Sequence, residues 1–137
     1  MAATFHLQIV SMDGLEFDGQ AQKVSCRTIH GDLAILARHC NYCTAVGMGC
    51  AQVVLEDGTV RHAACIGGML TMMNGQCRLI ATTWEWSDEI DLDRARQAEE
   101  RARQRLSDRG ISEQELKMAE AKLHRALVRI SAAEQKM

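Results

Sequence analysis

Residues Ser87–Met137 read SDEIDLDRARQAEERARQRLSDRGISEQELKMAEAKLHRALVRISAAEQKM, and their pattern decides how the rest of the chain is interpreted. Alanine and leucine recur three or four residues apart over residues 95–106 and again over residues 116–130, which is the spacing of helices with one buried face. Gly110 is expected to end the first helix, and Ser112 with Glu115 forms a capping-box pattern that starts the second. Because the connection is short, the helices are predicted to form an antiparallel hairpin.

The inward faces of the two predicted helices are narrow. They consist of Ala95, Ala98, Ala102 and Leu106 in the first helix, and of Leu116, Ala119, Leu123, Ala126, Leu127 and Ile130 in the second. A buried methyl-sized group contributes only about 0.8 kcal/mol. Such a hairpin is therefore attached by a few contacts, which a ligand or partner could reverse. A hairpin that stays permanently packed is an equally open interpretation of these residues.

Composition changes near Trp86 and divides the chain into two predicted domains, residues 1–86 and residues 87–137. All six cysteines and nine of the ten glycines precede Gly110, whereas the C-terminal part is rich in Ala, Arg and Glu. Residues 1–87 carry 5 Lys/Arg and 7 Asp/Glu, and residues 88–137 carry 11 of each. The net charge of -2 gives no indication of nucleic-acid or anionic-lipid binding.

The N-terminal part reads as short strands separated by turn signals. Strands are predicted over residues 4–10, 21–27, 66–72 and 77–81, and a hairpin over residues 53–60. The turn signals are Asp13-Gly14, Asp18-Gly19, Glu56-Asp57-Gly58 and Asn74-Gly75. This pattern favours a β sandwich or flattened barrel, so the whole chain is predicted to be α+β.

No secretory signal or membrane span is recognisable, because no apolar run approaches the required length. We therefore interpret the chain as cytosolic, with reduced thiols. His39-Cys40-x-x-Cys43 is the sharpest candidate for independent chemistry, since Cys-x-x-Cys pairs bind zinc or exchange disulfides. Zinc needs further ligands at matching spacing, and no second Cys-x-x-Cys exists. A small zinc- or thiol-dependent β-domain protein that uses His39, Cys40 and Cys43 is the alternative function.

Charged residues of the predicted hairpin suggest binding rather than catalysis. Asp91 and Arg94 share one face at a helix start, where an anion is favoured, although spacing alone supports a nucleotide site only weakly. The second helix carries a basic stripe of Lys117, Lys122, Arg125 and Arg129, which is either solvated or docks on an acidic partner. No residues combine as nucleophile, base and orienting group, so no catalytic residue is predicted.

Several segments, taken in order, resemble the epsilon subunit family of bacterial F-type ATP synthases, and the match covers essentially the whole chain. Residues 5–11 look like the family's first strand, and residues 67–70 and 79–81 fit later strands. Residues 31–39 resemble its Gly-x-(Leu/Phe)-Gly-Ile-(Leu/Tyr)-Pro-x-His segment, with Ala34 and Ala37 as departures. Residues 90–95 match the (Ile/Leu)-Asp-x-x-Arg-Ala motif that begins the family's C-terminal hairpin.

The resemblance implies a ten-stranded β sandwich followed by a movable helical hairpin. It implies a non-catalytic rotor subunit on the cytoplasmic face of the bacterial membrane, which binds the gamma subunit and the c-ring, couples proton or sodium flow to ATP synthesis, and inhibits ATP hydrolysis when the hairpin extends toward the catalytic alpha and beta subunits. It implies no required cofactor and ATP as a regulatory ligand. Nucleic acid is not an expected partner, and the membrane is reached only through the complex.

The resemblance also assigns residues to three sites. The ATP site comprises Asp91, Arg94 and Ala95 by motif match, with Glu85 and Arg101 as weaker candidates. The surface that contacts the c-ring and gamma comprises His30, Gly31, Asp32, Arg38, His39, Asn41 and Tyr42. The inhibitory contacts of the second helix are Lys117, Lys122, Arg125 and Arg129.

Overall fold

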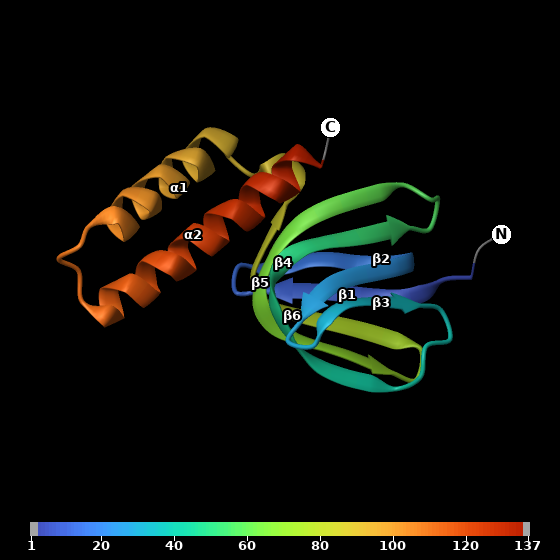
Figure 1. The fold of residues 1–137 in the computed structure, drawn as a ribbon. Coiled ribbons are helices and arrows are strands. Elements are labelled where there is room, and N and C mark those ends of the chain that lie inside the picture. The colour runs from blue at the N-terminus through green and yellow to red at the C-terminus, as the bar shows by residue number, and fades with distance from the viewer. Residues whose placement is uncertain (1–2, 136–137) are drawn as a thin grey trace.

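Six β-strands are followed by a helical hairpin (Figure 1). The structure is a computed structural model that describes residues 3–135. A short 3-10 helix, η1 (Ser87–Glu89), joins the strands to α1 (Leu92–Ser107) and α2 (Glu113–Glu134). This architecture confirms the predicted α+β class. The strands are β1 (Phe5–Ser11), β2 (Gly14–Thr28), β3 (Gly31–Leu36), β4 (Tyr42–Leu55), β5 (Val60–Met73) and β6 (Gln76–Trp86).

The strands form one sheet that folds over into two layers. Its order is β1-β6-β5-β4-β2-β3, and β2 also pairs with β1. Ala21 of β2 lies opposite Phe5 of β1 and also opposite Leu55 of β4. The sheet therefore closes on itself as a flattened barrel, which removes most of its open edges.

The structure corrects the strand count that the family resemblance implies. Residues 3–135 contain six strands rather than ten, because β2, β4, β5 and β6 are 11 to 15 residues long and continue around the sandwich. β5 bends at Gly67 and Gly68, whose φ angles of 72° and 133° are strained for other residues. A Cβ atom at Gly68 would collide with the Ile80 carbonyl oxygen, so the bend requires glycine there.

Asp18-Gly19 does not form the predicted turn. Asp18 and Gly19 lie inside β2, opposite Gln8 and Leu7 of β1. Leu7 is fully buried, and continuous pairing with this core strand overrides the local turn preference of an Asp-Gly dipeptide. The other predicted turns are confirmed, because each lies at the junction of two consecutive strands.

The sandwich interior is apolar, and an aromatic cluster closes it where β6 ends. Trp84 and Trp86 pack edge to face, with ring centroids 5.2 Å apart. The Arg61 guanidinium stacks 3.7 Å above the Trp86 ring centroid. Since η1 begins directly after Trp86, this cluster fixes the position from which the hairpin starts.

The antiparallel arrangement of α1 and α2 is confirmed (Figure 1). Arg96, near the start of α1, pairs with Glu134 at the end of α2, and Arg105 pairs with Glu115 at the other end of the hairpin. Each helix starts with a side-chain cap: Asp91 accepts from the Arg94 N–H at 3.1 Å, and Ser112 accepts from the Glu115 N–H at 3.1 Å. Between them lies a seam of buried alanines: Ala95, Ala102, Ala119 and Ala126.

Two details of the predicted hairpin are wrong. α1 ends at Ser107, before Gly110, because Asp108 is extended and its carboxylate accepts a hydrogen bond from the Gly110 N–H at 2.9 Å. Leu127 is 39% exposed rather than inward, and its neighbour Val128 is buried instead. The reason is that α2 buries two faces, one against α1 and one against the sandwich.

Helix α2 is the part of the hairpin that rests on the sandwich, against β4 and β5 (Figure 1). Ala64, Val128 and Ala132 form the centre of this contact, and Met48, Cys50 and Ile90 surround it. Burying one valine and two alanine methyl groups is worth roughly 3 to 5 kcal/mol. The hairpin is therefore held by a small contact that is separate from the sandwich core.

Candidate functional site

A cavity of about 410 Å³ lies at the root of the hairpin, where β6, η1, α1 and α2 meet. All five residues that the sequence assigns to the nucleotide site line it: Glu85, Asp91, Arg94, Ala95 and Arg101. Its other lining residues are Glu89, Ile90, Ala98, Ala126 and Arg129. We call this cavity the junction pocket.

Local backbone structure fixes one wall of the junction pocket. Asp91 caps α1 through its carboxylate, and its carbonyl oxygen accepts from the Ala95 N–H at 3.0 Å. Ala95 is buried, so its methyl group faces the interior of the hairpin while Arg94 is exposed. The motif at residues 90–95 thus places a carboxylate and a guanidinium on the same pocket wall.

Arg129 and Glu85 form the part-buried ion pair of this pocket. The Arg129 Nε donates to the Glu85 Oε1 at 2.6 Å, and each side chain is about one-third exposed, 31% and 32%. Sequence reasoning places Arg129 only on the basic stripe and misses this role. The sequence nevertheless contains a signal for this position of Arg129. Ala126, three residues earlier, belongs to the predicted inward face, and an antiparallel hairpin brings this part of the second helix next to the start of the first.

The lining of the junction pocket is suited to binding an ionic ligand with polar groups. Three arginines can neutralise an anion such as a phosphate, and three carboxylates can accept hydrogen bonds from amino or hydroxyl groups. The described residues that line it include no Ser, Thr, Cys, His or Lys. The geometry therefore supports recognition of a ligand.

The residues assigned to the c-ring and gamma surface do not lie together. His30, Gly31 and Asp32 are at one end of β3, and Arg38 to Tyr42 follow its other end. A six-residue strand separates the two groups by roughly 17 Å. The two groups therefore lie at opposite ends of β3: Asp32 lines a cavity beside α2, whereas the Asn41 Oδ1 accepts a hydrogen bond from the Asn74 N–H at the β5–β6 turn.

The basic stripe assigned to α2 is also divided by the structure. Lys122, Arg125 and Arg129 line a groove between α1 and α2, whereas Lys117 does not. Lys117 is exposed. Because an α-helix has 3.6 residues per turn, Lys117 lies on a different side of α2 from the face that the other three residues share. In this docked arrangement the stripe faces α1 in part, rather than lying wholly on the outer surface.

The Cys-x-x-Cys segment lies at the tip of the sandwich, far from the hairpin root in the chain. Cys40 and Cys43 are exposed free thiols, and the Cys40 Sγ is 3.9 Å from the His39 Nδ1. Within residues 3–135, no three His, Cys, Asp or Glu side chains gather in a way that could hold a metal ion. The described part of the chain therefore gives the zinc alternative no third ligand.

Comparison with known families decides the assignment. A family described as "ATP synthase, Delta/Epsilon chain, beta-sandwich domain" matches residues 4–87, and one described as "ATP synthase, Delta/Epsilon chain, long alpha-helix domain" matches residues 88–134. The chain belongs to the ATP synthase delta/epsilon family. Both of its parts, the sandwich and the hairpin, are accounted for by this family, and the resemblance drawn from the sequence is confirmed.

Curated relatives of the family support the same assignment along the whole chain. The chain is 35% identical over 133 residues to the ATP synthase epsilon chain of Exiguobacterium sp., covering 97% of this chain and 98% of the relative. It is 37% identical over 134 residues to that of Desulforamulus reducens, covering 98% and 100%. A relative from Acetobacterium woodii, named as sodium ion specific, is 36% identical over 108 residues, covering 79% and 81%.

Two solved structures share the fold. A chain of the Euglena gracilis mitochondrial ATP synthase, in a structure of OSCP, F1 and c-ring, matches with a TM-score of 0.84 at 20% identity, covering 98% of this chain and 83% of that one. A chain of the Tetrahymena thermophila central stalk and c-ring matches with a TM-score of 0.63 at 11% identity, covering 96% and 98%. Within residues 3–135, neither α1 nor α2 combines the length with the apolar character that a membrane-spanning helix needs.

Proposed function

We propose that this chain is a non-catalytic rotor subunit whose sandwich binds the gamma subunit and the c-ring, and whose hairpin restrains ATP hydrolysis. In this account the subunit transmits rotation between proton or sodium flow and ATP synthesis. Family membership and the central-stalk fold support the rotor assignment. The observation that carries the regulatory part is the small contact between α2 and the sandwich, centred on Ala64, Val128 and Ala132.

A contact of this size allows the hairpin to occupy two positions. Its apolar part is worth roughly 3 to 5 kcal/mol, and the Arg129–Glu85 pair adds about 1 kcal/mol at most, because both side chains are one-third exposed. When the hairpin leaves the sandwich, it loses this docking free energy. An acidic surface on the catalytic alpha and beta subunits would compensate for the loss by contacting Lys117, Lys122, Arg125 and Arg129. The hairpin would then leave the sandwich only inside the assembled enzyme.

ATP in the junction pocket would favour the docked position. The pocket combines residues of β6, α1 and α2, so it exists only while these elements are together. A ligand shifts such an equilibrium by its difference in affinity for the two states. An affinity ratio of about 100 corresponds to about 2.7 kcal/mol, which is comparable to the docking contact.

Assembly is tested first by pull-down with gamma and c subunits. The proposal predicts that the chain is retained with both, and failure to join either one would end the rotor assignment. Hydrolysis is tested with a cysteine pair, Ala64→Cys with Ala132→Cys, because these residues pack in the same cluster. Oxidation should lock the hairpin down and raise the hydrolysis rate of the assembled enzyme, whereas either single substitution serves as a control. An unchanged rate would favour a fixed adaptor.

The nucleotide site is tested by calorimetry of the isolated chain. ATP should release heat on binding, and Arg94→Ala should weaken binding about tenfold, because it removes a charge-assisted contact to phosphate. Arg103→Ala is the matched control, since Arg103 lies on the same helix, pairs with Glu99 and does not line the pocket. Absence of heat at millimolar ATP would retire the ATP site.

A further inference from the structure

Strand β3 forms an open edge of the sandwich. It is the last strand in the sheet order and, within residues 3–135, it pairs only with β2. Thr28 and Gly31 face each other across the two-residue turn that joins β2 to β3. Such a closing pair is hydrogen-bonded, and bonded and non-bonded pairs alternate along an antiparallel ladder. The backbone groups that point away from β2 therefore belong to Asp32, Ala34 and Leu36.

This edge lacks the features that usually block the addition of another strand. Proteins protect open edges with lysine, proline, bulges or a covering element. Residues 31–37 include no lysine or proline, and the register between β3 and β2 is continuous from Gly31 to Leu36. The Leu36 carbonyl accepts a hydrogen bond from the His39 N–H at 3.2 Å. The other outward groups are free to pair with a strand of another chain.

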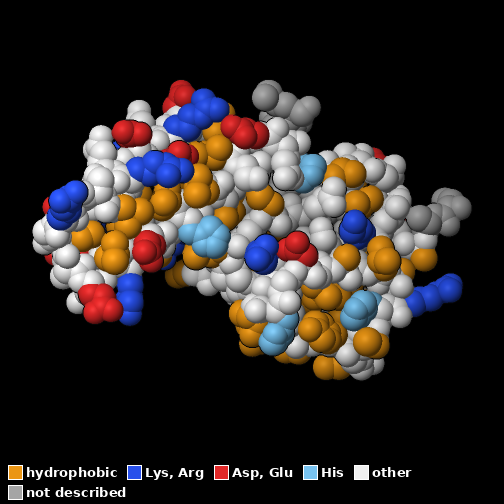
Figure 2. Space-filling model, viewed as in Figure 1, with side chains coloured by type: hydrophobic (Ala, Val, Ile, Leu, Met, Phe, Trp, Pro, Cys, Tyr) orange, Lys and Arg blue, Asp and Glu red, His pale blue; other side chains and the backbone are white. Residues whose placement is uncertain are grey.

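Apolar side chains border the open edge. Ile29 is 66% exposed and Leu36 is 54% exposed, and Tyr42 is exposed as well. Figure 2 shows hydrophobic side chains gathered over the lower part of the sandwich, where Figure 1 places β3. A strand added at this edge would remove part of this apolar surface from water, in addition to pairing the backbone.

The charges at the two ends of the edge are opposite in sign. Asp32 lies at the start of β3, its side chain is 83% exposed, and its Oδ1 is 3.9 Å from the Arg27 guanidinium. Arg38 lies just after the end of β3, and within residues 3–135 no carboxylate is within ion-pair distance of it. Antiparallel pairing of this edge with itself brings the acidic end of one strand to the basic end of the other. The edge is thus self-complementary, as a two-fold dimer requires.

We propose that two copies of this chain pair through their β3 edges, antiparallel and about a two-fold axis. The register that joins the most free backbone groups places Ala34 opposite the same residue of the second copy and Asp32 opposite Leu36. Arg38 then lies diagonally across from Asp32 of the second copy, at about 7 to 8 Å, which a long side chain can bridge. A parallel arrangement would bring like charges together instead.

The dimer is a form of the chain outside the rotor. One edge strand with its flanking side chains lies near or below about 1,200 Å², the lower end for stable interfaces, so a dissociation constant on the order of 100 μM is expected. His30, Asp32, Arg38 and Tyr42 belong to the proposed c-ring and gamma surface and flank the paired strands. Dimerisation and rotor assembly therefore exclude each other, although the pairing itself does not depend on the rotor function.

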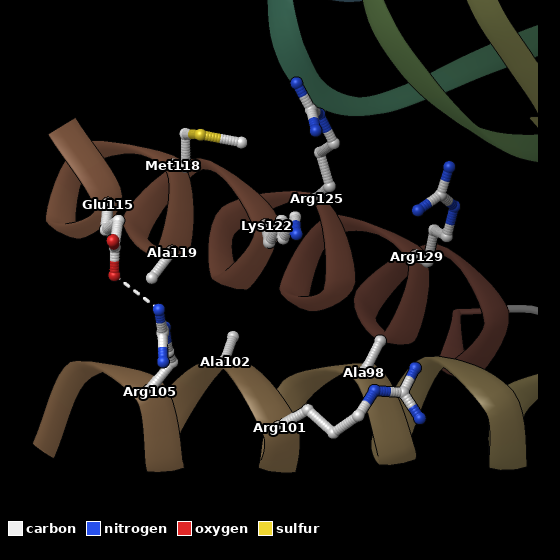
Figure 3. A pocket seen from close by; sticks show the side chains of 10 residues that line it. All are labelled: Ala98, Arg101, Ala102, Arg105, Glu115, Met118, Ala119, Lys122, Arg125 and Arg129. Atoms are coloured by element: carbon white, nitrogen blue, oxygen red, sulfur yellow. Dashed lines mark hydrogen bonds and ion pairs between the residues drawn. The ribbon is translucent and has the colours of Figure 1, made fainter. Parts of the chain in front are cut away.

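The hairpin takes no part in this pairing. A groove of about 540 Å³ between α1 and α2 is lined only by residues of these two helices (Figure 3). None of them belongs to β3 or to the turns that flank it. Ligand binding at the hairpin is therefore expected to be equal in monomer and dimer, so a test of the dimer does not depend on the nucleotide site.

Sedimentation velocity of the full chain under reducing conditions, from about 5 to 500 μM, tests the proposal. The dimer fraction should rise with concentration and no larger species should form, because a two-fold pairing uses up both edges. Asp32→Arg and Arg38→Asp should each weaken dimerisation about fivefold, since like charges then meet at both ends. The double variant should restore the dimer. Glu120→Arg reverses an exposed charge on α2 and should leave dimerisation unchanged.

The backbone part of the pairing has its own test. Ala34→Pro removes an N–H group that points to the free edge, so it should abolish the dimer while β2–β3 pairing remains. Circular dichroism checks that this variant is folded, and the charge series decides the question if it is not. In the unmodified chain, hydrogen exchange of the Ala34 N–H should slow as the concentration rises.

Four outcomes would overturn the proposal. The first is a monomer at every concentration. The second is a dimer that forms only without reducing agent, which would indicate a disulfide through the exposed Cys40 or Cys43. The third is a dimer that neither charge reversal weakens. The fourth is protection of the Ala34 N–H only when gamma or c subunits are added, which would assign the edge to the rotor interface alone.

Discussion

Glu85 and Arg129 are 44 residues apart in the sequence and meet at 2.6 Å across the root of the hairpin. Each side chain is about one-third exposed, so water screens the pair. The contribution of the ion pair to the free energy of docking is therefore set by its geometry rather than by burial. Because Glu85 belongs to the sandwich and Arg129 to α2, this single bond reports directly on whether the hairpin is docked.

A double-mutant cycle on Glu85→Gln and Arg129→Gln measures this bond. Each single variant is expected to lower the free energy of docking by about 1 kcal/mol, and the double variant by little more, because both lose the same interaction. Hydrogen exchange of α2 amide groups gives the docking free energy. Additive effects of the two substitutions would show that the residues do not interact in solution.

Buried thiols give the second prediction at this scale. Burial raises the pKa of Cys26 to about 11 and the pKa of Cys65 and Cys77 to about 12, from an ordinary value of 9.0. The folded chain keeps these protons at a pH where the unfolded chain releases them. The contribution of these thiols to the free energy of unfolding should therefore be constant below about pH 8 and fall as pH rises from 9 towards 11.

Urea denaturation under reducing conditions measures that fall. Each thiol contributes about 1 kcal/mol per pH unit to the slope. Cys77→Ala should reduce the alkaline slope, whereas Cys43→Ala should not, because Cys43 is exposed. Equal slopes in all three proteins would contradict the assignment to buried thiols.

What the sequence predicts at the scale of residues depends on distance along the chain. The cap at Ser112 is recognised because it bonds a residue only three positions away. The role of Arg129 in the junction pocket is missed because its partner lies on β6, outside any local pattern. The clustering of the five candidate residues comes from the family motif and not from spacing.

Glycine at a bend of β5 is an element-scale requirement. Gly68→Ala should destabilise the sandwich by more than about 3 kcal/mol, because its Cβ would strike the Ile80 carbonyl and its φ of +133° is strained. Gly58→Ala is the matched control: its φ is +89°, but the space around it is open, so a cost of about 1 kcal/mol is expected. Thermal unfolding followed by circular dichroism ranks the two, and an equal cost would refute the collision.

The alanine seam is the corresponding requirement of the hairpin. Ala102→Leu should separate α1 from α2 and cost 1 to 3 kcal/mol, roughly the usual penalty of overpacking, because Ala102 is 4% exposed. Gln97→Leu, on the exposed side of α1, should have little effect. Helix content on heating is the measurement, and a neutral Ala102→Leu would mean that the seam is not closely packed.

The sequence predicts best those elements in which apolar residues repeat with a single local period. Both helices follow the 3.6-residue repeat, so their existence and pairing are confirmed, although α1 ends earlier than Gly110 indicates. The strands were harder, because β2 crosses from one layer to the other and pairs with β1, β3 and β4. Asp18-Gly19 is a turn signal in isolation, but long-range pairing with β1 decides its conformation.

At the scale of the whole molecule, two parts with different kinds of stability are joined at Trp86-Ser87. The sandwich is closed by strand pairing and has a continuous apolar core, whereas the hairpin contacts it through one small apolar cluster and the Arg129–Glu85 ion pair. The junction pocket belongs to the hairpin and its root. Ligands would therefore act on the weakly held part and leave the sandwich unchanged.

The central claim is that the hairpin can leave the sandwich and that bound ATP keeps it docked on the sandwich. A distance measurement between spin labels at Glu56→Cys on the sandwich and Arg109→Cys on the helical turn tests it in the assembled enzyme, with the exposed native thiols Cys40 and Cys43 replaced by serine. Two distance populations are expected without ATP, and only the one that belongs to the docked hairpin is expected at saturating ATP. A single distance that ATP does not change would contradict it.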